Sequence, residues 1–91
     1  MDFVDRTIEI ARGNVKSGGR PFACFITKDG EVLVEAANQV AQTNDPTAHA
    51  EILAIQKGSQ LLESEHFHGC TFYILAHPCP MCLAVQKRSY L

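Results

Sequence analysis

The sequence predicts an α/β domain with the element order αββαβα. First, the chain has 91 residues, of which 46% are hydrophobic and 20% are charged, as in one small folded domain. Second, segments with apolar residues at helical spacing alternate with short β-prone runs. Third, glycine and proline residues separate these segments. No repeat or low-complexity tract is present.

The first half of the chain predicts a helix followed by two strands. Residues 2–17 form an amphipathic helix, which ends at a Gly-Gly pair and has its apolar face at Val4, Ile8, Ala11 and Val15. Residues 22–27 and 32–37 are β-prone runs joined by the turn sequence Lys28-Asp29-Gly30-Glu31, in which Gly can take a positive φ. We therefore expect an antiparallel hairpin.

The second half predicts a helix, a strand and a last helix. After a polar loop over residues 38–44, Asp45-Pro46 is expected to begin a helix, with Asp as its cap. Its buried stripe is predicted at Ile52, Ile55, Ser59 and Leu62, and Gly58 should weaken its later turns. Residues 71–76 form a β-prone run, expected to be buried on both faces. The last helix begins at Pro80 and runs towards Leu91.

The net charge and the cysteine content limit the classes of function that the sequence allows. The net charge of −2 and the pI of about 6.0 argue against nucleic-acid binding by gross charge. No apolar run has the length of a membrane span, and the acidic N-terminus does not resemble a signal peptide, so we expect a cytoplasmic protein. In that compartment four cysteines favour metal or redox chemistry over disulfides. Cys24 and Cys70 are expected to be buried as small hydrophobic residues.

Two short motifs predict a metal centre. His49-Ala50-Glu51 and Pro78-Cys79-Pro80-Met81-Cys82 both lie near predicted helix starts. His49, Cys79 and Cys82 supply three nitrogen or sulfur donors, the number in a catalytic zinc site that keeps its fourth position for water. Glu51 then remains to carry protons as a general acid and base. A Cys-x-x-Cys motif alone would more often be half of a structural zinc site or a redox pair.

Together these motifs resemble the cytidine deaminase superfamily, whose signature is H-x-E followed by P-C-x-x-C. With Asn38 and the run Asn44-Asp45-Pro46-Thr47-Ala48-His49-Ala50-Glu51, the chain is most similar to bacterial guanine deaminases. The tRNA adenosine deaminases share the last seven residues of this run. The resemblance implies a three-layer αβα fold and one zinc ion per chain. It also implies that this chain is a C-terminally truncated domain, in which the last strands of the family's usual five-stranded mixed sheet are missing.

The resemblance also implies a reaction and a substrate site. Guanine would be deaminated to xanthine and ammonia by Glu51-assisted attack of zinc-bound hydroxide. The Asn38 carboxamide and the Ala50 backbone amide would hold the base, and Phe22 would line the pocket. The alternatives are deamination of adenosine in tRNA, or of cytosine or cytidine, and an inactive zinc-binding fragment that acts through oligomerisation.

The chain departs from the family at several positions. His77 replaces a usual Glu, Gln86 replaces an aliphatic residue and should weaken the packing of the last helix, and Ala23-Cys24 replaces a Gly-Ala pair. Without further strands, residues 71–76 would be an open sheet edge. We expect a homodimer to form through this edge, or a second polypeptide to supply the missing strands.

Overall fold

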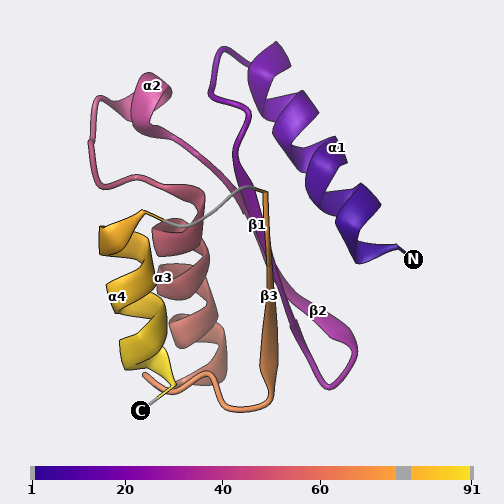
Figure 1. Cartoon of the computed structure of the whole chain (residues 1–91), viewed down its shortest axis with the longest axis vertical. Helices are drawn as coiled ribbons and strands as arrows, with labels where there is room; N and C mark the ends of the chain where they lie inside the picture. Colours follow the sequence, from indigo (N-terminus) through magenta and orange to yellow (C-terminus); the bar gives the residue numbers. More distant parts are fainter. Residues whose placement is uncertain (1, 76–78, 91) are drawn as a thin grey trace.

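The computed structural model describes residues 2–75 and 79–90, and the helices and strands follow the expected order with one addition. The predictions for Ala76, His77 and Pro78 concern residues outside the described ranges. In chain order (Figure 1) the elements are α1 (Phe3–Lys16), β1 (Ala23–Lys28), β2 (Glu31–Ala37), α2 (Val40–Thr43), α3 (Ala50–Leu62), β3 (Cys70–Ile74) and α4 (Pro80–Ser89).

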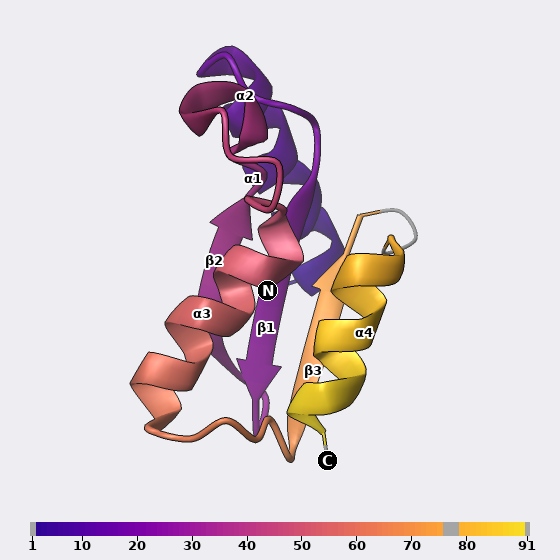
Figure 2. The ribbon, with the colours of Figure 1, turned by 90° about the vertical axis from the view of Figure 1, so that its left-hand side faces the viewer.

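The described sheet has three antiparallel strands in the order β2-β1-β3. The predicted hairpin is confirmed, and its turn places both Asp29 (φ 52°) and Gly30 (φ 80°) in the left-handed region. Helix α1 covers one face, and α3 and α4 cover the other (Figures 1 and 2), which confirms the three-layer arrangement. Strand β1 is therefore central and buried over residues 23–27.

Helix α1 has nearly the predicted extent, but its predicted buried face is confirmed only at Ala11, with Ile8 half-buried, and was wrong at Val4 and Val15. The side chain of Asp2 accepts hydrogen bonds from the first turn, as an N-cap does. The face against the sheet carries Thr7, Ala11 and Asn14, whereas Val4 and Val15 are 58% and 50% exposed. The polar members of the buried face are tolerated because both are hydrogen-bonded, Thr7 through its hydroxyl to the carbonyl of Phe3.

The predicted start of the second long helix at Asp45-Pro46 was also wrong. The Asp45 carboxylate accepts hydrogen bonds from the backbone and hydroxyl of Thr47, and this local turn competes with a helix. The chain stays extended at His49 (φ −72°, ψ 150°), and α3 begins only at Ala50. Part of the predicted loop 38–44 instead forms the short helix α2.

Helix α3 packs most closely through small residues. Ala50, Ala54 and Gly58 are buried, while the predicted stripe Ile52, Ile55, Ser59 and Leu62 is only half-buried. A Cβ on Gly58 would lie 2.7 Å from Cε2 of Phe67, so this glycine permits the close approach of a buried ring. The helix continues to Leu62, and Gly58 acts as a packing position rather than as an end.

Strand β3 lies at an edge of the described sheet because it pairs only with β1. The prediction of burial on both faces was wrong for the described strand: Cys70 is buried, but Thr71 is exposed and Phe72, Tyr73 and Ile74 are half-buried. Cys24 and Cys70 are buried, as expected. No helix in the described ranges has the length and apolar character needed to span a membrane.

Candidate metal centre and adjoining cavity

Three potential metal ligands meet where two helices begin. His49 is the N-cap residue of α3, and Cys79 is the N-cap residue of α4. The Nδ1 atom of His49 lies 3.6 Å from Sγ of Cys79 and 3.5 Å from Sγ of Cys82, and the two sulfurs are 3.4 Å apart. The structure therefore brings together the three residues that the motifs indicated, although they are 30 and 33 positions apart in the chain.

The size of this triangle fits zinc. With a Zn–S distance of about 2.3 Å and a Zn–N distance of about 2.0 Å, the ligand atoms on one face of a tetrahedron are about 3.5 to 3.8 Å apart. The three observed distances are close to this range. Three such donors would occupy one face of the tetrahedron and leave its fourth corner for a non-protein ligand.

The two sulfurs have different surroundings. The backbone N–H of Cys82 donates to Sγ of Cys79 at 3.5 Å, and this hydrogen bond lowers the pKa of the Cys79 thiol. Burial raises the pKa of the Cys82 thiol, whose side chain is inaccessible to solvent. Burial therefore favours the neutral thiol at Cys82, and a bound divalent cation would supply the positive charge that its thiolate needs.

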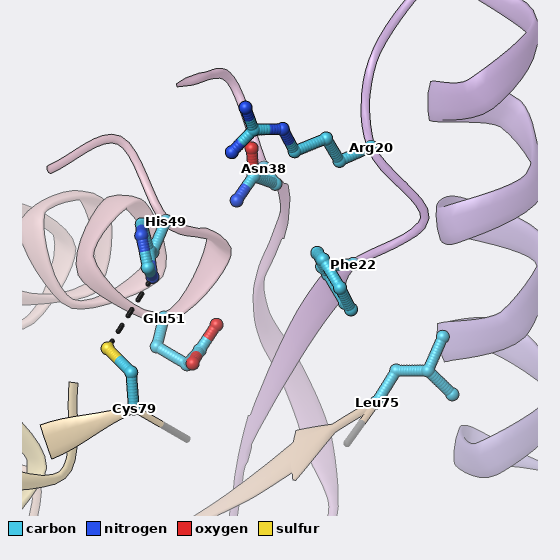
Figure 3. A pocket seen from close by; sticks show the side chains of 7 residues that line it. All are labelled: Arg20, Phe22, Asn38, His49, Glu51, Leu75 and Cys79. Atoms are coloured by element: carbon cyan, nitrogen blue, oxygen red, sulfur yellow. Dashed lines mark hydrogen bonds between the residues drawn. The ribbon is translucent and has the colours of Figure 1, made fainter. Parts of the chain in front are cut away.

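A cavity of about 190 Å³ opens beside the three donors. The residues that line it are Arg20, Phe22, Asn38, His49, Glu51, Leu75 and Cys79 (Figure 3). Five of these were predicted site residues, whereas Arg20 and Leu75 were not. Cys82 and Ala50 do not line the cavity: both are fully buried, and Ala50 packs in the core between α3 and the sheet. The role predicted for the Ala50 backbone amide stays a prediction.

Glu51 is the acidic residue of the cavity wall. It lies in the first turn of α3, where the helix dipole favours a negative charge, and is only 7% exposed. Its carboxylate is turned towards the centre of the cavity (Figure 3), so it faces the same space as the His49 and Cys79 side chains. It is thus placed beside the metal donors without being one of the three clustered ligands.

Asn38 is held in place by three hydrogen bonds. Its backbone N–H donates to the carbonyl of Phe22 at 3.0 Å, and its own carbonyl accepts from Nδ2 of Asn14 at 2.8 Å. Its side-chain oxygen accepts from the N–H of Val40 at 3.0 Å, at the start of α2. The Nδ2 group of Asn38 is left as a donor that faces the cavity (Figure 3).

Asn14 is a residue that the sequence analysis missed. Its Nδ2 donates to the carbonyls of Arg20 and Asn38, both at 2.8 Å. Its Oδ1 accepts from the side chains of Gln39 at 3.3 Å and Gln42 at 3.0 Å. It therefore ties α1 to both segments that supply the cavity wall. The only signal in the sequence is its position, three residues after Ala11 on the face of the helix that proved to be buried.

Comparison with known proteins agrees with this geometry. Residues 1–89 match the family described as the cytidine and deoxycytidylate deaminase zinc-binding region. A guanine deaminase of Bacillus subtilis is 43% identical over 82 residues, which are 89% of this chain and 53% of that protein. A tRNA-specific adenosine deaminase of Aquifex aeolicus is 36% identical over 80 residues, with 88% of this chain and 53% of that protein covered.

A solved structure of Bacillus subtilis guanine deaminase superposes with a TM-score of 0.89 at 41% identity, covering 93% of this chain and 55% of that one. The chain thus spans about half the length of the relatives that it matches. With His49, Cys79 and Cys82 placed where they could hold a metal ion, the chain belongs to the cytidine and deoxycytidylate deaminase family through the zinc-binding region.

Proposed function

We propose that this protein deaminates a free purine base by hydrolysis, converting guanine and water to xanthine and ammonia. The observation that carries the proposal is the position of Glu51, whose carboxylate faces a cavity that His49 and Cys79 also line. The choice of guanine is supported by the 43% identity to a guanine deaminase.

Different residues of the site would bind the metal and transfer protons in this reaction. Zinc held by His49, Cys79 and Cys82 would supply a water molecule acidic enough to act as a nucleophile near neutral pH. Glu51 takes a proton from this water as the new C–O bond forms at the ring carbon that bears the amino group. It then gives a proton to the departing nitrogen, so that the C–N bond breaks and ammonia leaves.

Binding of the base falls to the opposite part of the cavity. The Nδ2 group of Asn38 is a fixed hydrogen-bond donor, and the ring of Phe22, which is 41% exposed, offers an apolar surface to a planar base. The backbone N–H of Ala50, at the first position of α3, has no backbone acceptor among the described residues and is proposed to donate to the same base.

The proposal is tested with zinc-loaded protein and guanine, by measuring xanthine and ammonia. A matched Glu51→Gln variant should keep its zinc but lose about 10²- to 10⁴-fold in turnover, because general acid–base catalysis contributes about that much. Protein that holds one zinc ion and forms no xanthine would contradict the proposal. That result would favour the alternative of an inactive zinc-binding fragment.

Deamination of adenosine in tRNA is the second candidate, favoured by the 36% identity to a tRNA-specific adenosine deaminase. The net charge of −2 argues against it, since RNA binding depends strongly on positive charge. A gel-shift titration with tRNA separates the two candidates, and deamination of free cytosine or cytidine is tested in the same ammonia assay. The cytoplasmic location stays a prediction, for cell fractionation to test.

We also propose that a second copy of the chain covers the open side of β3, forming a homodimer. Within the described sheet, β3 has no neighbour on that side. Next to it, apolar side chains of α1 and Leu75 line a shallow groove, and Val15 in this groove is 50% exposed. Size-exclusion chromatography with light scattering tests the proposal, and a stable monomer at high concentration would contradict it.

A further inference from the structure

Arg20 has no role in the site described so far, although it lines the same cavity as Glu51. Its main chain is fixed, because its carbonyl accepts hydrogen bonds from Nδ2 of Asn14 at 2.8 Å and from the N–H of Phe22 at 2.9 Å. Its side chain reaches from the segment before β1 towards Asn38 (Figure 3).

The Arg20 guanidinium has no ion pair or side-chain hydrogen bond within the described ranges. By contrast, Arg6, the arginine of α1 nearest the hairpin, binds Glu35 with two hydrogen bonds of 2.7 and 2.9 Å. The donors of Arg20 are therefore available to a molecule that enters the cavity.

Arg20 and Asn38 together make one wall of the cavity rich in donors. A guanidinium has five N–H donors and no acceptor, and Asn38 offers its Nδ2 group because its side-chain oxygen already accepts from Val40. Glu51, His49 and Cys79 lie in another part of the same cavity (Figure 3). A complementary substrate would carry its amino group at the Glu51 end and two neighbouring acceptors at the Arg20 end.

Guanine has this arrangement. Its reacting amino group is on C2, and O6 and N7 form a pair of adjacent acceptors that arginine binds with two hydrogen bonds. Adenine carries an amino group at C6 instead, so it presents a donor where guanine presents O6. A donor that faces a guanidinium makes no hydrogen bond with it, so adenine would gain less from Arg20 than guanine does.

We propose that Arg20 is a specificity-determining residue that selects purines with an oxo group at C6, by donating hydrogen bonds to O6 and N7. This inference rests on the proposed purine site. In this inference, Arg20 distinguishes guanine from 6-aminopurines.

The experiment compares guanine with 2-aminopurine, which keeps the reacting amino group and N7 but has hydrogen in place of O6. The fluorescence of 2-aminopurine reports its own binding, and guanine binding follows from competition; xanthine formation is measured in parallel. The variants are Arg20→Gln and, as a matched control, Arg12→Gln, which removes an exposed arginine of α1 outside this cavity. All proteins are loaded with zinc.

Arg20→Gln should weaken guanine binding and lower its kcat/KM by about 5- to 150-fold, the range of one good bidentate contact. For 2-aminopurine the change should stay much smaller, and Arg12→Gln should alter neither base by more than about two-fold. Arg20→Lys should restore part of the guanine affinity, because Lys keeps a positive charge and N–H donors but not the planar fork.

The outcomes separate this inference from the proposed function. Equal losses for both bases, or no loss, would overturn the role of Arg20 while leaving the deaminase proposal intact. Selective loss of guanine binding in a protein that forms no xanthine would support the role of Arg20 and contradict the proposed reaction. If the unaltered protein binds neither base, both are overturned.

Discussion

Replacing Asn14 with alanine should loosen the whole cavity wall, although Asn14 does not line the cavity. Its carboxamide makes four hydrogen bonds, two of them to the carbonyls of Arg20 and Asn38. The side chains of Gln39 and Gln42 can turn to water after the change, whereas the carbonyl of Asn38 is bonded in a buried position. The loss is therefore dominated by the two carbonyl bonds.

The magnitude follows from this count. An unsatisfied buried polar group costs about 1–3 kcal/mol, and a partly exposed bond contributes about 1 kcal/mol. Alanine recovers about 0.5 kcal/mol through its higher helix propensity. The free energy of unfolding should fall by about 1.5–3.5 kcal/mol, which lowers Tm by roughly 6–28 °C in a domain of this size.

The assay is thermal and urea unfolding, with binding of 2-aminopurine as the readout of the cavity. Gln42→Ala serves as the matched control, because it removes only one exposed partner of the same carboxamide and should cost less than about 0.5 kcal/mol. Asn14→Asp keeps the shape and the acceptor but cannot donate to the two carbonyls, so it should be as damaging as alanine. If Asn14→Asp is as stable as the unaltered protein, the argument from donated hydrogen bonds is refuted.

Three further predictions concern packing and the metal centre. Gly58→Ala should lower the free energy of unfolding by about 1–2 kcal/mol, because its Cβ would meet a buried ring. Gly13→Ala, with open space around it, should raise the free energy of unfolding by about 0.5–1 kcal/mol. Equal effects of the two changes in urea unfolding would contradict the close-packing argument. Gln86→Leu should raise the unfolding free energy by about 1 kcal/mol, because Nε2 of Gln86 is buried without a hydrogen-bond partner in the described structure, and a loss of stability would count against this reading. Iodoacetamide at about pH 8 should label Cys79 only after zinc is removed. Cys24 should stay unlabelled, because burial raises the pKa of its thiol to about 12. Mass spectrometry measures the labelling, and labelling of Cys79 in zinc-loaded protein would argue against its role as a ligand.

Much of the fold was accessible from local sequence patterns. The turn at Asp29-Gly30 needs residues that tolerate positive φ, and the apolar spacing of residues 2–17 indicates a helix wherever it packs. The cluster of metal donors was also predictable, because His49, Cys79 and Cys82 lie in two short motifs that together match one signature. Such signals depend on residues within a few positions in the sequence, so they can be interpreted without the tertiary structure.

Other features depended on contacts between distant segments. The α1 face chosen by hydrophobicity alone was wrong at Val15, because a hydrogen bond across 24 positions makes it favourable to bury Asn14 instead. The start of α3 was wrong because the Asp45 side chain bonds to Thr47 instead of capping a helix. The burial of β3 depended on how many strands flank it, which its own sequence does not specify.

The sequence by itself determined the order of the elements apart from α2, and it indicated His49, Cys79 and Cys82 as the donors that the structure brings together. Only the tertiary structure decided that Asn14 holds the segments of Arg20 and Asn38, and that Arg20 lines the same cavity as Glu51. The physical reason is that residue types within short motifs are enough to indicate which side chains can bind a metal ion. The shape and polarity of a cavity, by contrast, arise from long-range hydrogen bonds and packing between elements that are far apart in the chain.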